Sequence, residues 1–253
     1  MATRFLPETY EYPETIPRDV FVSDFFDYAK GEHVTMVGPT GSGKTTLAKE
    51  LIEQNASPQL PALVLCIKPE DEVVEKLFIK DAKFKLLRTW PPPPTDKLTK
   101  SRNGYVLWPE HAFDPDKDDP MLYREMRKAL LAGYANKVGN AKNVRGNILF
   151  SDEVWGLVDL GLKRELTTLW TRARSMGCGL WAASQRPALI PLAAYSEPEH
   201  IFIHYSADKR ARDRYKEIGG VNPLMIQEVT AELEWHQFLY IRRSDRTYCV
   251  VDA

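Results

Sequence analysis

Short apolar runs alternate with amphipathic segments along most of this chain. Segments in which apolar residues recur at helical spacing follow these runs. In the C-terminal third of the chain, one further segment predicts a short charged helix. Several of the runs are apolar throughout, as in strands that are buried on both faces. Strands that alternate with helices predict an α/β fold, a mostly parallel twisted sheet covered by helices on both faces. The predicted strands are 33–37, 62–67, 84–90, 147–153, 178–184 and 200–206, and the predicted helices are 44–54, 70–79, 121–134, 162–173 and 207–219.

The two ends and the middle of the chain depart from this alternation. Residues 1–30 start with a stretch rich in Pro, Glu and Tyr, and we expect an extended N-terminal arm before a single domain over 31–253. Residues 91–120 are rich in Pro and turn-forming residues, which predicts an insertion with one short strand at 105–108 and a helix only after it. A β-hairpin over 237–252 is expected to close the fold.

Composition limits the possible function classes. The chain has 253 residues and a net charge of −1, so its overall charge does not favour binding to nucleic acid. A local basic surface is still compatible with this net charge. Its three cysteines, Cys66, Cys178 and Cys249, lack the spacing of a metal site. The N-terminal residues show no apolar segment of a signal peptide, and no run approaches the roughly 20 apolar residues of a membrane span. We therefore expect a cytoplasmic protein without a membrane partner.

A glycine-rich stretch between the strand at 33–37 and the helix at 44–54 matches the pattern G-x-x-x-x-G-K-[ST]. Glycines allow successive backbone N–H groups to converge on a phosphate, and the N-terminus of the following helix favours an anion. Lys44 is expected to reach the terminal phosphates of ATP, and the Thr45 hydroxyl to bind Mg²⁺. A chance match is disfavoured because the motif follows a strand and opens a helix. The predicted ATP-binding residues are Gly38, Pro39, Thr40, Gly41, Ser42, Gly43, Lys44, Thr45 and Thr46.

Two adjacent carboxylates end the apolar run at 147–153. Asp152 is placed to bind Mg²⁺ together with Thr45, and Glu153 to polarise a water molecule that attacks the terminal phosphate. The alternative is an ordinary acidic turn after a buried strand. A simple nucleotide kinase usually has no adjacent glutamate, so the doublet favours an ATPase.

Polar residues at both ends of the run at 178–184 form a third group. Gln185 follows this strand, where a side chain can contact the terminal phosphate, although it could also cap a turn. Arg172 and Arg174 precede the strand at the end of a helix. Such an arginine could reach the nucleotide of a neighbouring subunit, or could simply favour the helix dipole.

The segment "SQRP" at 184–187, together with "GEHVTMVGPTGSGKTT", "ILFSDE" and "EWHQFLYIRR", resembles the FtsK–HerA superfamily of DNA-pumping ATPases over about 31–253. The resemblance implies a P-loop NTPase with a RecA-like (ASCE) core that acts as a homo-oligomeric ring of five or six subunits around DNA. It also implies that Arg174 is the trans-acting arginine and Gln185 the sensor. Because we recognise no membrane segment and no DNA-reading module, the viral genome-packaging branch fits best. That branch implies double-stranded DNA bound without sequence preference, a capsid portal or vertex protein as partner, and the host cytoplasm as location.

The DNA contact is the least defined part of this interpretation. Lys137, Lys142 and Arg145 lie in a Gly- and Asn-rich loop directly before the acidic strand, and loops of this kind can bind phosphates without reading sequence. An ordinary solvated loop is the alternative. Two other functions also remain open, a nucleotide-gated assembly, morphogenesis or secretion factor and an AAA-type helicase loader. The expected C-terminal hairpin disfavours the loader, which should carry a helical lid.

Overall fold

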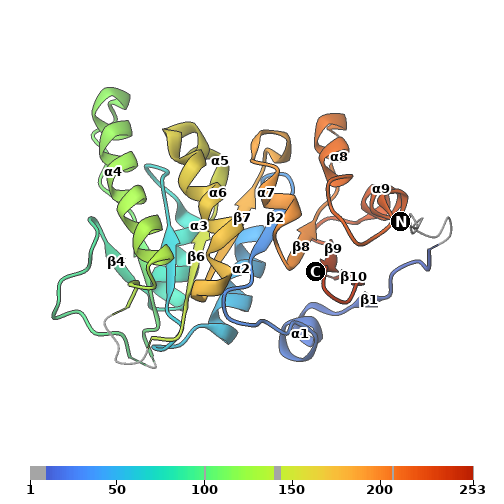
Figure 1. Ribbon diagram of the computed structural model, residues 1–253, viewed down its shortest axis with the longest axis horizontal. Coiled ribbons are helices and arrows are strands. Elements are labelled where there is room, and N and C mark those ends of the chain that lie inside the picture. Colours follow the sequence, from blue (N-terminus) through green and yellow to red (C-terminus); the bar gives the residue numbers. More distant parts are fainter. Residues whose placement is uncertain (1–9, 100, 140–143, 207, 253) are drawn as a thin grey trace.

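The computed structural model describes residues 10–99, 101–139, 144–206 and 208–252, which form a ten-stranded sheet with helices on both faces (Figure 1). The strand order is β1-β10-β9-β8-β2-β7-β6-β3-β5-β4. Neighbouring strands from β8 to β4 run parallel, whereas β9 is antiparallel to both β8 and β10. The predicted parallel α/β sheet and its closing hairpin are thus confirmed. The strands are β1 (Thr15–Ile16), β2 (Val34–Val37), β3 (Ala62–Leu65), β4 (Lys85–Leu87), β5 (Gly104–Leu107), β6 (Asn147–Ser151), β7 (Cys178–Ser184), β8 (His200–Ile203), β9 (Phe238–Arg242) and β10 (Thr247–Val251).

Alternate side chains of the strands enter two separate hydrophobic cores, one on each face of the sheet. Leu149 of β6 packs in the core that contains helices α4, α6 and α9, while its neighbour Phe150 packs in the core that contains α2. The helices are α1 (Arg18–Val20), α2 (Lys44–Asn55), α3 (Glu72–Val74), α4 (Pro115–Tyr134), α5 (Val154–Leu157), α6 (Lys163–Arg172), α7 (Ala193–Ser196), α8 (Lys209–Tyr215) and α9 (Pro223–Glu232). Shorter helical segments are η1 (Phe21–Phe25), η2 (Glu75–Asp81), η3 (Val158–Leu162), η4 (Arg174–Met176) and η5 (Pro187–Leu189). Within the described ranges, no helix combines the length and apolar character that crossing a membrane requires.

Helix α4 begins earlier than its sequence suggests. The turn-rich stretch before Met121 was expected to be irregular, but the helix already starts at Pro115. Asp114 caps it by accepting a hydrogen bond from the backbone N–H of Asp116, and Pro115 takes the first position, where its missing N–H has no cost. The expectation was wrong because proline was read as a helix breaker at a place where it favours helix initiation.

The N-terminal segment also differs from the expected extended arm. β1 adds a parallel strand beside β10, and the chain then turns helical through α1 and η1. Phe21 is fully buried, with its ring centroid 4.8 Å from that of Tyr240 and 5.8 Å from that of Phe202. Residues within the predicted arm therefore contribute to the main core.

The strand order places the predicted chemistry on one edge of the sheet. β7 lies between β2 and β6, with Val37 opposite Ser184 and Ala182 opposite Ser151. Because these strands are parallel, the loops that follow all three emerge at the same edge, as ligand-binding loops do in open α/β sheets. The segments that precede them lie at the opposite edge.

Candidate nucleotide-binding site

The glycine loop curls tightly around the side chain of Lys44. Gly41 and Gly43 have φ angles of 78° and 92°, a left-handed conformation that favours glycine, and α2 begins at the next residue. Lys44 is 5% exposed, and its Nζ donates hydrogen bonds to the carbonyl oxygens of Gly38 at 2.9 Å and Pro39 at 2.8 Å. Burial lowers the pKa of Lys44 to about 8. The loop thus places a lysine in a largely desolvated environment at the N-terminus of a helix.

Residues from the C-terminal third of the chain support the outside of this loop. A Cβ atom at Gly38 would lie 2.6 Å from Cβ of His204, just after β8, so only glycine fits there without rearrangement. Trp235 and His236, in the segment between α9 and β9, lie beside Gly41 and Gly43. The glycines are therefore needed for close packing as well as for backbone conformation.

The structure brings the predicted metal-binding residues together. The hydroxyl of Thr45 donates a hydrogen bond to the carboxylate of Asp152. Hydroxyl and carboxylate oxygens suit Mg²⁺, which proteins usually bind through one or two carboxylates together with substrate phosphates and water. In the described part of the chain, no group of three or more His, Cys, Asp or Glu side chains could hold a metal. The residues present therefore fit a Mg²⁺ ion that is bound jointly with a nucleotide.

Glu153 is held by the end of the neighbouring strand. Ser184 donates its hydroxyl to Oε1 of Glu153 at 3.1 Å, and the backbone N–H of Gln185 donates to Oε2 at 3.4 Å. Burial raises the pKa of Glu153, and these two hydrogen bonds oppose the shift. Oε1 of Gln185 in turn accepts a hydrogen bond from the Thr40 hydroxyl at 2.7 Å. Three adjacent strands are thus linked at the site by side chains at their ends.

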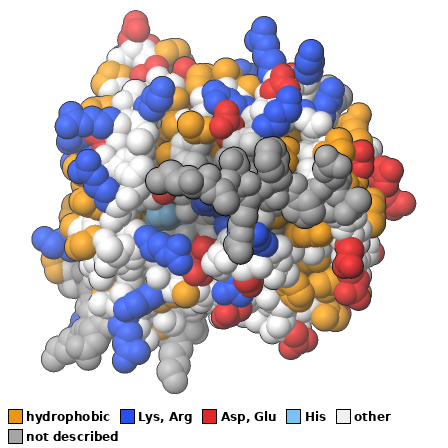
Figure 2. Space-filling view, turned by 45° about the vertical axis from the view of Figure 1, so that its right-hand side comes forward, with side chains coloured by type: hydrophobic (Ala, Val, Ile, Leu, Met, Phe, Trp, Pro, Cys, Tyr) orange, Lys and Arg blue, Asp and Glu red, His pale blue; other side chains and the backbone are white. Residues whose placement is uncertain are grey.

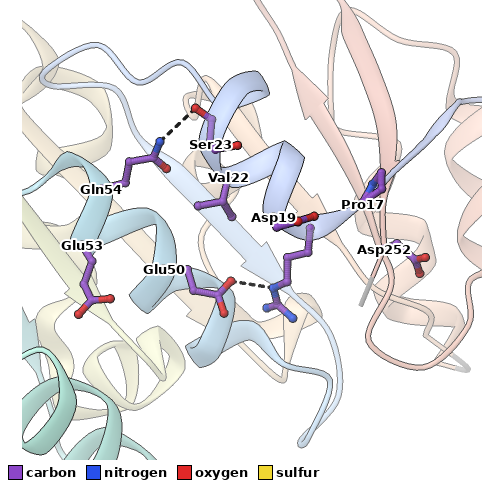
Figure 3. Close-up of a pocket in the computed structure, with 9 residues that line it drawn as sticks. Pro17, Asp19, Val22, Ser23, Glu50, Glu53, Gln54 and Asp252 are labelled. Atoms are coloured by element: carbon purple, nitrogen blue, oxygen red, sulfur yellow. Dashed lines mark hydrogen bonds and ion pairs between the residues drawn. The ribbon is translucent and has the colours of Figure 1, made fainter.

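A cavity of about 220 Å³ lies at this edge of the sheet, and Glu153 and Ser184 are not among the residues that line it. Its lining includes Lys44, Thr45, Asp152 and Gln185. A larger cavity, of about 790 Å³, runs along α2 near Arg18, which is paired with Glu50 at 2.8 Å, and near Asp252 (Figure 3). None of the predicted phosphate- or metal-binding residues lines this larger cavity, so the smaller one is the candidate site. Its full lining is Thr40, Gly41, Gly43, Lys44, Thr45, Thr46, Lys68, Asp71, Val73, Asp152, Gln185 and His236.

Arg174 does not join this cavity. It precedes β7 and so lies at the edge of the sheet opposite the glycine loop, where its guanidinium pairs with Glu32 at 3.2 Å and Glu199 at 3.4 Å. Its side chain is still 56% exposed, and Arg172 nearby is exposed as well. Neither arginine contacts the nucleotide cavity of its own chain.

The predicted DNA-binding loop lies at the same edge as Arg174. Lys137 and Arg145 are exposed, and Lys142 lies outside the described residues. Figure 2 shows one face of the molecule, on which basic side chains predominate on the left and acidic side chains along the right edge, and the net charge of the chain is −1. A DNA contact would therefore have to be local.

Sequence reasoning missed several residues that belong to the cavity or its supports, above all Lys68, Asp71 and Ser184. Lys68 and Asp71 follow β3 closely, at the same edge of the sheet as Asp152. The rule that identified Asp152, a polar residue just after a buried strand, also applies to Lys68. What the sequence did not reveal is that β3 pairs with β6.

No protein-family model matches the sequence, and no curated protein matches it. Similar solved structures include the genome packaging NTPase B204 of Sulfolobus turreted icosahedral virus 2 in complex with sulfate, with a TM-score of 0.60, 14% identity, and coverage of 89% of this chain and 98% of that chain. The DNA-packaging ATPase B204 of Sulfolobus turreted icosahedral virus gives the same four values. The cytoplasmic domain of the Thermomonospora curvata type VII secretion ATPase EccC follows with a TM-score of 0.52 and 16% identity, over 88% of this chain and 25% of that chain. At such identities the likeness establishes the fold, and the expected P-loop NTPase fold is confirmed.

Proposed function

We propose that this chain is an ATPase that couples ATP hydrolysis to the translocation of double-stranded DNA, as one subunit of a viral genome-packaging ring of five or six copies. The observation that carries the proposal is the convergence of Lys44, Thr45 and Asp152 on a single cavity at the carboxyl edge of the sheet, with Glu153 held beside Asp152 by Ser184. Each of these groups has a distinct part in cleaving a terminal phosphate.

Lys44 and the backbone N–H groups of the glycine loop bind and orient the phosphates. Thr45 and Asp152 would hold Mg²⁺, which would neutralise charge on the phosphate oxygens. Glu153 accepts a proton from the attacking water, and its half-buried carboxylate is oriented by Ser184. Gln185, hydrogen-bonded to Thr40 of the loop, is positioned to respond to the terminal phosphate and to pass the change to β7.

The DNA-packaging role is supported by the B204 structures, because this chain aligns with nearly the whole length of B204. B204 was solved in complex with AMPPCP and with ATP-gammaS, which supports the binding of ATP. The likeness to EccC, a secretion ATPase, favours one second candidate, a secretion or assembly factor without DNA. Stimulation of ATP hydrolysis by DNA separates the two candidates, because only a translocase acts on DNA.

The central test is ATP turnover of the wild type and of Glu153→Gln, each with and without double-stranded DNA. We expect the wild type to hydrolyse ATP faster with DNA, and Glu153→Gln to lose about 10²- to 10⁴-fold in kcat while it still binds ATP, because only the general base is removed. Normal turnover by Glu153→Gln would contradict the assigned mechanism. Hydrolysis that is indifferent to DNA would favour the secretion or assembly role.

The DNA-binding loop is tested by replacing Lys137, Lys142 and Arg145 together with alanine. If these cations contact phosphates, the stimulation by DNA should fall, and the salt dependence of DNA binding should lose about one unit of slope for each contact removed. Hydrolysis without DNA should continue at the wild-type rate, because the loop lies at the edge of the sheet opposite the cavity. Unchanged stimulation would exclude this loop.

A further inference from the structure

A second lysine, outside the glycine loop and the acidic doublet, enters the candidate nucleotide cavity. Nζ of Lys68 lies 2.7 Å from Oδ2 of Asp71 and 3.1 Å from Oδ2 of Asp152. Lys68 and Asp71 line the cavity together with Lys44. β3, which Lys68 follows, pairs with β6 so that Leu65 lies opposite Ser151, and this register brings Lys68 to the acidic doublet.

The backbone of Lys68 is fixed by a hydrogen bond, whereas its ammonium group can move. The indole Nε1–H of Trp108 donates a hydrogen bond to the carbonyl oxygen of Lys68 at 2.7 Å. Asp71 is buried, and its Oδ1 caps α3 by accepting the backbone N–H of Val74 at 3.0 Å. The Lys68 side chain is 39% exposed, so its ammonium group can shift without disturbing either anchor.

The carboxylate of Asp152 cannot bind a metal ion and at the same time keep its full attraction for the ammonium group of Lys68. Asp152 already accepts from Thr45, with which it is expected to bind Mg²⁺. A divalent cation on Asp152 would repel the ammonium of Lys68 at 3.1 Å from the same carboxylate, and Asp71 would remain as the partner of Lys68. The phosphate chain would be a new anion in the same cavity, because its terminal phosphate is expected at Lys44 and Gln185, which also line this space.

We propose that Lys68 is a second phosphate-binding lysine that contacts the terminal phosphate of bound ATP, and that Asp71 is the residue that positions it. This inference rests on the proposed ATPase function. In this structure both Asp71 and Asp152 hold Lys68, and with Mg²⁺ on Asp152 only Asp71 would do so. The site would thus distinguish ATP from ADP through a cation that comes from β3 rather than from the glycine loop.

The test compares the binding of Mg·ATPγS and Mg·ADP to the wild type and to Lys68→Met, measured by calorimetry. A charge-assisted hydrogen bond to the terminal phosphate predicts a loss of about tenfold to a hundredfold in ATPγS affinity, with ADP affinity nearly unchanged. Lys68→Arg should restore part of the ATPγS affinity, because it retains the charge. The matched control is Lys80→Met, since Lys80 is 64% exposed and pairs with Glu75 away from the cavity, and it should bind both ligands as the wild type does.

Asp71→Asn tests the positioning role separately. Asparagine keeps an oxygen that can cap α3 but loses the charge that holds Lys68. The thermal midpoint without nucleotide should therefore stay close to that of the wild type, while ATPγS affinity falls in the same direction as in Lys68→Met, by a smaller factor.

Two results would overturn the inference while the proposed function survives. One is a Lys68→Met chain that binds ATPγS as tightly as the wild type. This includes the case in which the variant reaches that affinity at a lower Mg²⁺ concentration, because Lys68 would then only occupy the metal position. The other is an equal loss for ATPγS and ADP. A wild-type chain that binds neither ligand would overturn the proposed function and the role of Lys68 together.

Discussion

At the residue scale, the sequence reveals a functional group when the pattern that marks it is contiguous in the chain. Lys44 could be predicted because the whole glycine loop that surrounds it is contiguous. Asp152 and Glu153 could be predicted because two carboxylates directly after an apolar strand form a recognisable pattern, although their partners Thr45 and Ser184 lie far away in the sequence. Lys68 and Ser184 could not be predicted, because they reach the acidic doublet only through the pairing of β3 with β6 and of β6 with β7. Roles that depend on strand order stay hidden until the order is known.

Ser184 supports a prediction about the pH dependence of the reaction. As the proposed general base, Glu153 would have to be deprotonated, and burial raises its pKa, whereas the hydrogen bond from Ser184 lowers it. Ser184→Ala removes the opposing effect, so the pKa of Glu153 rises further and the acidic limb of the kcat profile moves to higher pH. We also expect kcat to fall severalfold, by the worth of roughly one hydrogen bond, with little change in KM.

The measurement is kcat for ATP hydrolysis from pH 5 to 9. Ser23→Ala serves as the control, because the Ser23 hydroxyl bonds to exposed Asp24 and not to the site. An acidic limb at the same pH in Ser184→Ala and the wild type would show that Ser184 does not position Glu153 during turnover.

At the scale of elements, strands with strongly apolar sequences could be predicted, and segments that depend on a neighbour could not. β1 has only two residues and exists because β10 lies beside it. Helix α9, which was not predicted, has nearly continuous apolar character on its buried side, with Met225, Ile226 and Val229 in the core. β1 is too short for any periodicity to show, and the apolar residues of α9 are spaced as in a helix but over only ten residues.

The contact between α4 and β6 gives a prediction about stability. A Cβ atom at Gly133 of α4 would lie 2.4 Å from Cδ1 and 2.8 Å from Cγ of Leu149, on the strand that leads to the acidic doublet. Gly133→Ala should therefore lower the free energy of unfolding by about 1–3 kcal/mol through overpacking, although alanine favours a helix.

Chemical denaturation measures this change, with Gly219→Ala as the control, because a Cβ atom at Gly219 would meet nothing within 4 Å. A Gly133→Ala chain as stable as the wild type would mean that α4 can move away from β6 without cost. The approach of the helix to this strand would then not be tightly specified.

At the scale of the whole molecule, the distance between Arg174 and its own glycine loop leads to a test of assembly. If Arg174 completes a neighbour's site, Arg174→Ala and Lys44→Ala should each abolish most hydrolysis, the former by about 10³- to 10⁵-fold. Mixed rings should regain activity, because an intact glycine loop in one chain meets an intact arginine in the next. With equal amounts and random mixing, roughly a quarter of the sites would be complete in a head-to-tail ring.

The mixing experiment is read as ATP turnover after the two variants are co-assembled. Arg172→Ala mixed with Lys44→Ala decides between the two arginines, which the sequence left open. Recovery in neither mixture would exclude both as trans-acting residues, and Arg174 would then be explained by its ion pairs with Glu32 and Glu199 alone.

The two outermost strands of the sheet, β1 and β4, have two and three residues. A long bare edge invites another chain to continue the sheet, and strands this short offer almost nothing to continue. These short edge strands therefore disfavour the pairing of strands between copies of the protein, which would build fibre-like stacks. If copies of the chain assemble into the proposed ring, side chains on helices and loops rather than paired strand edges would have to hold it together.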